Sequence, residues 1–180
     1  TPEISRGELA PRAKRGSAPP SQVGKMRLLT VENLTLRFKT DEGLVTAVDG
    51  VSFDIAPGEV LGLVGESGSG KSVTAKSLMQ LNPGNTVYDP ASRITLRTDG
   101  KDIDVLALTR PKDQRVIRGG AISMIFQEPM ASFAPAITIG DQMVEQLLIH
   151  TDLSKSAAKE LSVEMLTRVG ITEPAKRFRQ

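Results

Sequence analysis

The sequence contains no cysteine and no tryptophan, and its aromatic residues are limited to one tyrosine and five phenylalanines. The absence of cysteine excludes disulfide bonds and thiolate metal ligands, and it agrees with a reducing compartment. So few aromatic rings leave no platform on which the bases of a nucleic acid strand could stack. Apolar runs are also short, and none approaches the roughly 20 residues that a membrane-spanning helix needs. We therefore expect any membrane association to come through partner proteins.

The charge of the chain is unevenly distributed. The formal net charge is +2, but residues 1–27 contain six Lys and Arg residues against two Glu, so the remainder is mildly acidic. Residues 1–25 are rich in Pro, Arg, Ala, Ser and Gly and have no hydrophobic period, which is typical of disordered segments. We predict a disordered basic extension over residues 1–26 and no binding of nucleic acid.

The most informative segment is a glycine-rich loop that directly follows an apolar run at residues 60–64. The loop reads Gly65-Glu66-Ser67-Gly68-Ser69-Gly70-Lys71-Ser72, which has the spacing G-x-x-x-x-G-K-[ST] of a phosphate-binding loop. Its glycines let backbone N–H groups point at a phosphate, and a side chain at Gly70 would block that approach. Lys71 can reach the β- and γ-phosphate oxygens, and the hydroxyl of Ser72 can ligate Mg²⁺. The loop predicts binding of a nucleoside triphosphate.

The hydrophobic pattern on either side of this loop indicates an α/β protein. Alternating apolar residues predict half-buried antiparallel strands at residues 34–38 and 51–55, with a turn at residues 41–43. The nearly continuous apolar runs at residues 60–64 and 121–126 predict strands that are buried on both faces. A short strand is expected at residues 94–96, and residues 82–93 read as a loop. Helical spacing predicts helices over residues 72–81, 140–150 and 154–169, the last closed by Gly170.

Three stretches of the sequence are similar to the ATPase subunits of ATP-binding-cassette (ABC) transporters, and in particular to those of peptide importers. They are Thr46-Ala47-Val48-Asp49-Gly50-Val51-Ser52-Phe53, then Gly65 to Ala75, and Met124-Ile125-Phe126-Gln127-Glu128-Pro129-Met130. The resemblance implies a P-loop NTPase (RecA-like) core with an antiparallel β-subdomain, followed by the start of a helical subdomain. It divides residues 27–180 into the β-subdomain and P-loop core (27–126) and the Q-loop with the start of the helical subdomain (127–180).

The resemblance also implies roles for two residues outside the loop. Phe38 matches the position whose ring stacks on adenine, although it is equally well explained as the last inward residue of an alternating strand. Gln127 matches the Q-loop glutamine, whose amide can ligate Mg²⁺ or orient the attacking water, so that Lys71 and Gln127 are the catalytic candidates. Glu128 ends an apolar run as a Walker B acid does, but Gln-Glu-Pro does not match that motif. The only histidine, His150, lies too early to be the switch histidine and is expected to face solvent.

The sequence departs from the family pattern after Gln127, because no Leu-Ser-Gly-Gly signature and no Walker B acids follow. We therefore expect the chain to be a fragment that binds ATP with Mg²⁺ but does not hydrolyse it alone. In the full-length protein, the resemblance implies ATP hydrolysis coupled to uptake of peptides or a similar small solute. It implies two transmembrane permease subunits, a second ATPase subunit and, indirectly, an external solute-binding protein as partners. It places the protein at the cytoplasmic face of the inner membrane.

Two other functions are compatible with a phosphate-binding loop in a chain of this length. A small P-loop kinase would transfer the γ-phosphate to a metabolite, but its loop is expected on the first strand and an arginine-rich lid should follow. Here about sixty residues come first, and residues 93–118 show no compact lid pattern. A nucleotide-binding regulatory module without turnover differs from the transporter ATPase only in what lies downstream.

Overall fold

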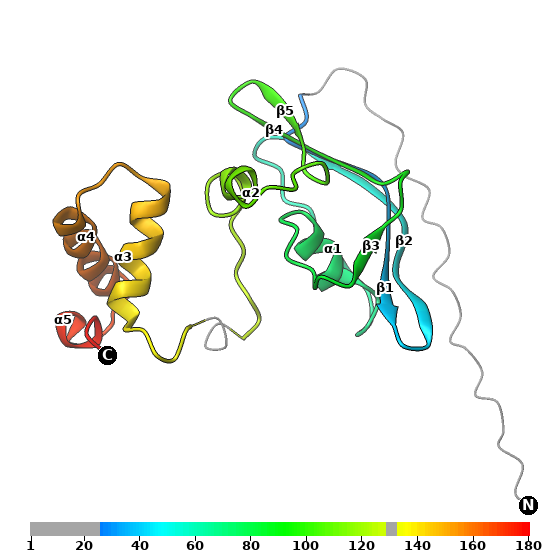
Figure 1. The fold of residues 1–180 in the computed structure, drawn as a ribbon. Coiled ribbons are helices and arrows are strands. Elements are labelled where there is room, and N and C mark those ends of the chain that lie inside the picture. The colour runs from blue at the N-terminus through cyan, green and yellow to red at the C-terminus, as the bar shows by residue number, and fades with distance from the viewer. Residues whose placement is uncertain (1–25, 129–132) are drawn as a thin grey trace, which may run out of the picture. The chain divides into compact units, whose positions relative to one another are not determined.

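The computed structural model describes residues 26–128 and 133–180 of the chain. Along the sequence, the described part contains strands β1 (Leu29–Thr40) and β2 (Gly43–Ile55), helix α1 (Lys71–Ser77), strands β3 (Thr86–Tyr88), β4 (Arg93–Thr98) and β5 (Lys101–Asp104), and helices α2 (Pro111–Ile117), α3 (Ile139–His150), α4 (Lys155–Arg168) and α5 (Pro174–Arg177) (Figure 1). Residue contacts divide the chain into two units, which meet between Gln114 and Arg115. The domain boundary predicted after residue 126 stays a prediction, and the predicted basic extension lies outside the described residues except for Met26.

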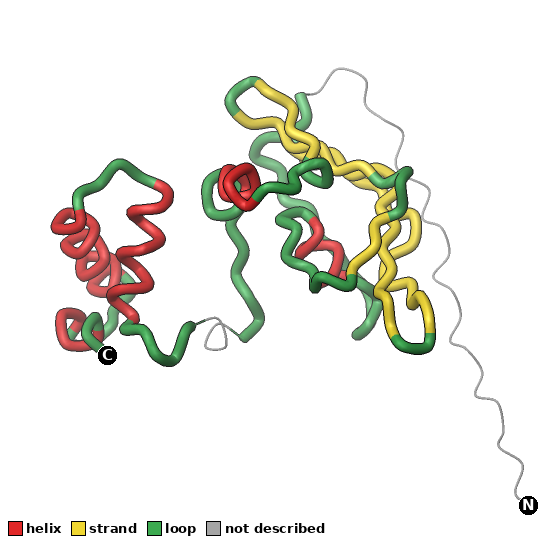
Figure 2. The backbone as a smooth tube through the Cα atoms, viewed as in Figure 1, coloured by secondary structure: helices red, strands yellow, loops and turns green. Residues whose placement is uncertain are grey.

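The first unit is built on an antiparallel sheet in which β1 pairs with three other strands. The order is β2-β1-β4-β5, and β3 pairs with the part of β1 that lies beyond β4 (Figure 2). Both strands that were predicted from alternation are confirmed, and they are longer than predicted. Burial alternates along β4, as expected for a strand with one buried face. Along β1 it alternates only at Leu29 and Val31, because Leu34, Thr35 and Leu36 are all buried.

The turn between β1 and β2 also follows the prediction. Asp41 and Glu42 connect Thr40 to Gly43, whose φ of 122° favours glycine. The hydroxyl of Thr40 donates to the carbonyl of Gly43 at 2.9 Å and closes the turn. At the far end of β1, Asn33 has a φ of 48° and interrupts the register with β2, and its backbone N–H donates to Ser52 Oγ.

The prediction of two buried strands at residues 60–64 and 121–126 is wrong for the described structure. Both segments run without regular strand structure, and the exposed fractions of Val60 and Val64 are 95% while that of Ile125 is 97%. An apolar run becomes a buried strand only where neighbouring strands pair with it. Among the described residues, neither segment belongs to a strand ladder, and the single isolated bridge joins Arg118 to Ile122.

Two further boundaries differ from the predictions. Helix α1 ends at Ser77 rather than near residue 81, because the chain turns tightly after it and Gln80 adopts a φ of 50°. The segment expected as a loop over residues 82–93 contains the short strand β3, which pairs with β1 between Leu36 and Phe38. Three residues give too short a pattern for periodicity to reveal.

The second unit contains a small helical core. Val144 of α3 and Ala158 of α4 are buried together with Phe178, and partly buried Leu147, Leu153, Val163 and Leu166 pack around them. Thr138 and Ser154 cap α3 and α4 by accepting hydrogen bonds from backbone N–H groups three residues later. Both helices match their predicted limits to within one residue. Gly170 follows α4 with a φ of 78°, and the N–H of Ile171 donates to the carbonyl of Leu166, as in a Schellman motif.

Candidate phosphate-binding site

The predicted phosphate-binding loop leads from an extended segment directly into α1. Gly68 and Gly70 have φ values of 80° and 89°, which glycine adopts without steric cost. Gly70 is the N-cap of α1 and offers no side chain to its free N–H groups. Lys71 is the first helical residue and Ser72 the second, and Ser72 is exposed. The local geometry is therefore that of a glycine-rich turn whose N–H groups are available to an anion.

The side chain of Lys71 is held inside the loop by three oxygen atoms. Its Nζ donates to the carbonyl of Gly65 at 2.6 Å, to the carbonyl of Glu66 at 2.7 Å and to Ser69 Oγ at 3.3 Å. The backbone N–H of Ser69 also donates to the Glu66 carbonyl at 3.2 Å. The lysine therefore ties the two ends of the loop together through its ammonium group.

A side chain at either of two loop glycines would meet a neighbour, which is a movable side chain at Gly65 and fixed backbone at Gly70. A Cβ on Gly65 would lie 2.5 Å from Ser69 Oγ, and a Cβ on Gly70 would lie 2.6 Å from the backbone oxygen of Ala47. Ala47 is the extra residue of a β-bulge in β2, because Leu36 is paired with Val48 while Arg37 is paired with Thr46. The sequence had suggested that Gly70 is needed for phosphate approach. The structure adds that the backbone of β2 occupies the space that a side chain at Gly70 would need.

Replacing Gly70 by alanine is expected to lower the free energy of unfolding by about 1–3 kcal/mol, since the new Cβ meets a backbone atom and the left-handed φ is strained. Nucleotide affinity should fall as well, because relief of the clash displaces the loop from β2. Urea denaturation and nucleotide titration measure the two effects. Gly84→Ala is the matched control, since a Cβ there meets nothing within 4 Å and no left-handed φ is involved. Equal stability of the two variants would contradict the expectation.

Phe38 occupies the last part of β1, where the strand leaves the core. Its Cα partners are Val45 on β2 and Thr86 on β3, and its side chain is half-buried. Leu36, two residues earlier, is fully buried, whereas Lys39 is exposed. Partial burial is compatible with both interpretations of Phe38, so the assignment to adenine stacking stays a prediction.

Gln127 belongs to the second unit, whereas Lys71 and Ser72 belong to the first. Gln127 and Glu128 are exposed and lie outside any strand, and the next two residues of the motif, Pro129 and Met130, lie outside the described residues. The role of Gln127 as a Mg²⁺ ligand or water-orienting group therefore stays a prediction. Among the described residues, the segment directly before Glu128 is not a strand, so the structure gives no support for Glu128 as a Walker B acid.

The expectation that His150 faces solvent is wrong in part. His150 is half-buried, and its ring covers the backbone of Gly119, so that a Cβ on this glycine would lie 2.6 Å from Nε2. Sequence spacing contains no signal for this contact, because 31 positions separate the two residues. The ring serves as packing for the turn after α2.

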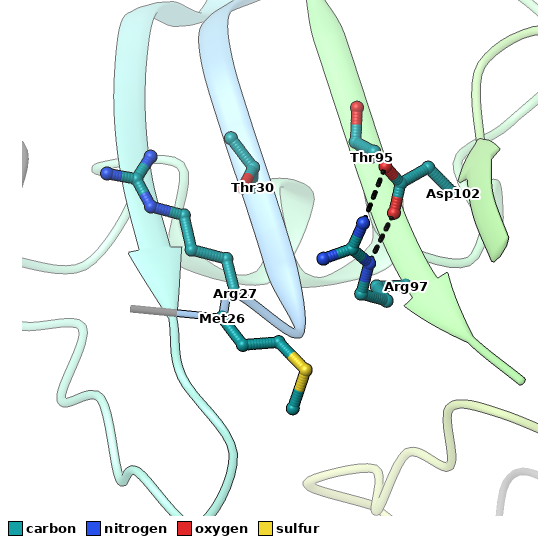
Figure 3. Close-up of a pocket in the computed structure, with 6 residues that line it drawn as sticks. All are labelled: Met26, Arg27, Thr30, Thr95, Arg97 and Asp102. Atoms are coloured by element: carbon teal, nitrogen blue, oxygen red, sulfur yellow. Dashed lines mark hydrogen bonds and ion pairs between the residues drawn. The ribbon is translucent and has the colours of Figure 1, made fainter. Parts of the chain in front are cut away.

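A polar pocket of about 250 Å³ lies elsewhere on the first unit (Figure 3). It is lined by Met26, Arg27, Thr30, Thr95, Arg97 and Asp102. Both arginines are engaged: Arg97 Nε donates to Asp102 Oδ1 at 2.8 Å, and Arg27 pairs with Asp54 at 2.9 Å. None of the residues predicted to bind nucleotide lines this pocket, so the candidate site is assigned on the chemistry of the loop.

Only two titratable side chains have clearly displaced pKa values among the described residues, and both are surface groups. The backbone N–H of Ala91 and the guanidinium of Arg37 lower the pKa of Asp89, which follows β3. The carboxylate of Asp113 raises the pKa of Arg110 at the start of α2. Neither group belongs to the candidate site.

The described residues include one candidate protein ligand for Mg²⁺ at the loop, Ser72. Among the described residues, no group of three or more His, Asp and Glu side chains is placed to hold a metal ion. Mg²⁺ is usually bound through one or two protein ligands, water and substrate phosphates, and the exposed hydroxyl of Ser72 can supply one such ligand.

In the parts of the chain that the structure describes, every helix is too short or too polar to cross a membrane.

The loop, its lysine and the helix that follows define a phosphate-loop nucleotide-binding protein. The sequence profile of the ABC transporter family matches residues 48–179. The chain therefore belongs to the ABC transporter family. This match confirms the predicted fold class, an incomplete α/β domain of the P-loop NTPase type with an antiparallel sheet and helices.

The chain is also similar to curated ATP-binding proteins of transport systems. The chain is 46% identical over 154 residues to the dipeptide transport ATP-binding protein DppD of Bacillus subtilis (strain 168), an alignment that covers 86% of this chain and 44% of the relative. It is 45% identical over 154 residues to the oligopeptide transport ATP-binding protein OppD of the same organism, covering 86% of this chain and 42% of OppD. The peptidoglycan transport ATP-binding protein YejF of Agrobacterium fabrum is 46% identical over 153 residues, covering 84% of this chain and 27% of YejF. The chain thus spans less than half of the length of these relatives.

Proposed function

We propose that this chain is the ATP-binding part of an ABC importer subunit that powers uptake of peptides or a similar small solute. The observation that carries the proposal is the phosphate-binding loop in which Lys71 is already held by the carbonyls of Gly65 and Glu66. The names of the relatives support the solute class, since they include dipeptide and oligopeptide transport proteins. The family match favours this function over the small P-loop kinase.

In this proposal the backbone of Gly65, Glu66, Ser67, Gly68, Ser69 and Gly70 surrounds the β-phosphate of ATP. Lys71 exchanges part of its contacts with the loop for phosphate oxygens and neutralises their charge. With Mg²⁺ bound, the hydroxyl of Ser72 would be one of its ligands, and the role assigned to Gln127 is that of a Mg²⁺ ligand or of a group that would orient water. Phe38 stacks on the adenine ring. Bound Mg²⁺ would supply charge neutralisation at the phosphates.

The partners follow from the same proposal. Two transmembrane permease subunits bind near Gln127 and the helical unit, and a second ATPase subunit, identical or different, faces the phosphate loop. An extracytoplasmic solute-binding protein delivers the solute to the permease. The assembly lies on the cytoplasmic face of the inner membrane. The importer subunits named among the relatives support this arrangement.

We further propose that the 180-residue chain binds Mg-ATP without turning it over. Its sequence contains the phosphate loop but no Leu-Ser-Gly-Gly segment, and catalysis of phosphoryl transfer depends on complete positioning of all participating groups. Phosphate release by the purified chain, compared with its Lys71→Ala variant, tests this. Turnover that disappears in the variant would contradict it, whereas binding without turnover is also what a regulatory module would show.

A chimeric importer separates those two cases. Residues 27–180 of this chain would replace the aligned part of B. subtilis DppD, and uptake of a labelled dipeptide would be measured in cells that lack their own DppD. We expect uptake to be restored and to be abolished by Lys71→Ala in the chimera. A chimera that is stable in cells but leaves uptake at background would overturn the proposed importer function.

The Mg²⁺ dependence of binding tests the role assigned to Ser72. Ser72→Thr retains a hydroxyl and should leave Mg-ATP affinity within about threefold, whereas Ser72→Ala should weaken it about tenfold, since a metal ligand is lost. Titrations in EDTA provide the control, because there the serine and alanine forms should bind ATP alike. An alanine variant that keeps the full Mg²⁺ effect would remove Ser72 from the metal site.

A further inference from the structure

Helix α1 is fixed to the sheet at its N-terminal end by a contact of the phosphate loop. A Cβ on Gly70 would lie 2.6 Å from the Ala47 oxygen and 3.3 Å from Val48 Cγ2, so the backbone of Gly70 rests directly on β2. Val48 is itself buried. The position of the loop is therefore set by this part of β2.

The C-terminal end of α1 is fixed by a different residue, Asn82. Its Nδ2 donates to Ser77 Oγ at 2.8 Å and to the hydroxyl of Tyr88 at 3.1 Å, and lies 3.2 Å from the carbonyl of Val73. Ser77 is fully buried and donates to the same Val73 carbonyl at 2.8 Å. One amide group thus connects the last turn of α1 to the only tyrosine of the chain, on β3.

These two attachments meet on a single cross-strand row of the sheet. Leu36 of β1 is paired with Val48 on one side and with Tyr88 on the other, and Leu36 is fully buried. Phe38 follows two positions later on the same strand, so it belongs to the same face. Its partner on β3, Thr86, lies two residues before Tyr88. The positions of the helix that begins at Lys71 and of the strand segment that carries Phe38 are therefore both set by the row Val48, Leu36 and Tyr88.

The amide of Asn82 donates on one side and lacks a partner on the other. Among the described residues, two buried side-chain oxygens lack a hydrogen-bond partner, and they are Asn82 Oδ1 and Thr86 Oγ1. A buried oxygen without a partner destabilises a fold, so each such case calls for an explanation. Asn82 Oδ1 belongs to the amide that joins α1 to β3, and Thr86 Oγ1 lies on β3 itself.

We propose that Asn82 and Tyr88 are positioning residues that hold the phosphate-loop helix in register with the strand segment at Phe38, and so determine the preference of the site for a nucleotide over a bare polyphosphate. The inference rests on the proposed function. A nucleotide bound by the loop and by Phe38 must reach both at once, which makes its affinity depend on their relative placement. Tripolyphosphate binds to the loop alone, so its affinity does not depend on where Phe38 lies relative to the loop.

Affinities of the full 180-residue chain for Mg-ATP and Mg-tripolyphosphate test this by calorimetric titration. Tyr88→Phe removes one hydroxyl and keeps the ring, and Asn82→Leu removes all contacts of the amide at similar volume. We expect each variant to bind ATP about five- to tenfold more weakly and tripolyphosphate within about twofold of the parent. Ser92→Ala is the control for weakening of the same sheet, since Ser92 Oγ accepts from the Thr35 N–H at 2.9 Å and makes no contact with Asn82. It should leave the ratio of the two affinities unchanged.

Equal weakening of both ligands in Tyr88→Phe and Asn82→Leu would show a merely structural role and overturn the inference, as would unchanged ATP affinity. Lys71→Ala distinguishes this failure from failure of the proposed function. If Lys71→Ala loses both ligands while the ratio is unaffected by the two variants, only the inference fails. If Lys71→Ala retains ATP, the proposed function and the inference fail together.

Discussion

Replacing Lys71 by alanine is expected to weaken binding of Mg-ATP by about a hundredfold or more. The ammonium group makes charge-assisted hydrogen bonds, which are about twice as strong as neutral ones, and several phosphate oxygens lose their only fixed counter-charge in the loop when it is removed. The variant also removes the lysine donor from the carbonyl of Gly65 and one of the two donors from the carbonyl of Glu66, which keeps the Ser69 N–H. The substitution is therefore expected both to loosen the loop and to remove the positive charge that neutralises the phosphates.

Calorimetric titration of the purified variant measures this loss, with circular dichroism to verify folding. Lys76→Ala is the matched control, because Lys76 is half-buried on the same helix and lies outside the loop. We expect the control to bind within about threefold of the parent chain. Similar affinities for Lys71→Ala and the parent would mean that the loop does not bind the triphosphate.

Replacing Gly140 by alanine is expected to lower the unfolding free energy of the helical unit by about 2–4 kcal/mol. A Cβ there would lie 2.4 Å from two ring carbons of Phe178 and from its backbone oxygen. The Gly140 N–H donates to that same oxygen at 2.8 Å, so the ring and the backbone cannot both move away without loss. Overpacking of this kind in a core is strongly destabilising.

A double-mutant cycle with Phe178→Ala measures the coupling in urea denaturation. Phe178→Ala alone should destabilise the unit, because the ring is buried between α3 and α4 with Val144 and Ala158. In that background Gly140→Ala should cost less than half as much as in the parent. Additive effects of the two substitutions would show that the ring is not what excludes a side chain at position 140.

The candidate site illustrates what sequence reasoning reaches without coordinates. The loop was recognisable because each of its positions has a chemical requirement: glycine for left-handed backbone, lysine for phosphate charge, a hydroxyl for Mg²⁺. The contact between Gly70 and Ala47 was not recognisable, since it depends on a β-bulge whose extra residue has no sequence signal of its own. Asn82 and Tyr88 are close in sequence, but their relation to Val48 arises only because Tyr88 and Val48 are both paired with Leu36 in the sheet.

The difference between local patterns and contacts of distant segments also explains which predictions about strands, helices and His150 were wrong. Residues 60–64 and 121–126 are apolar enough for buried strands. A strand forms, however, only where a second segment pairs with it, and among the described residues no ladder includes these two segments. Helices α3 and α4 followed their predicted limits because their hydrogen bonds and caps are local. His150 escaped prediction because its contact with Gly119 spans two separate segments.

The sequence by itself indicated the phosphate-binding loop, the resemblance to the ABC family, the alternating strands and the limits of α3 and α4, because each of these is carried by short stretches of residues. The tertiary structure alone decided which apolar runs acquire strand partners, and how α1 is attached to both neighbours of Leu36. These features depend on pairing between distant segments. The free energy of such pairing depends on both segments at once, so the local sequence of one segment does not predict it.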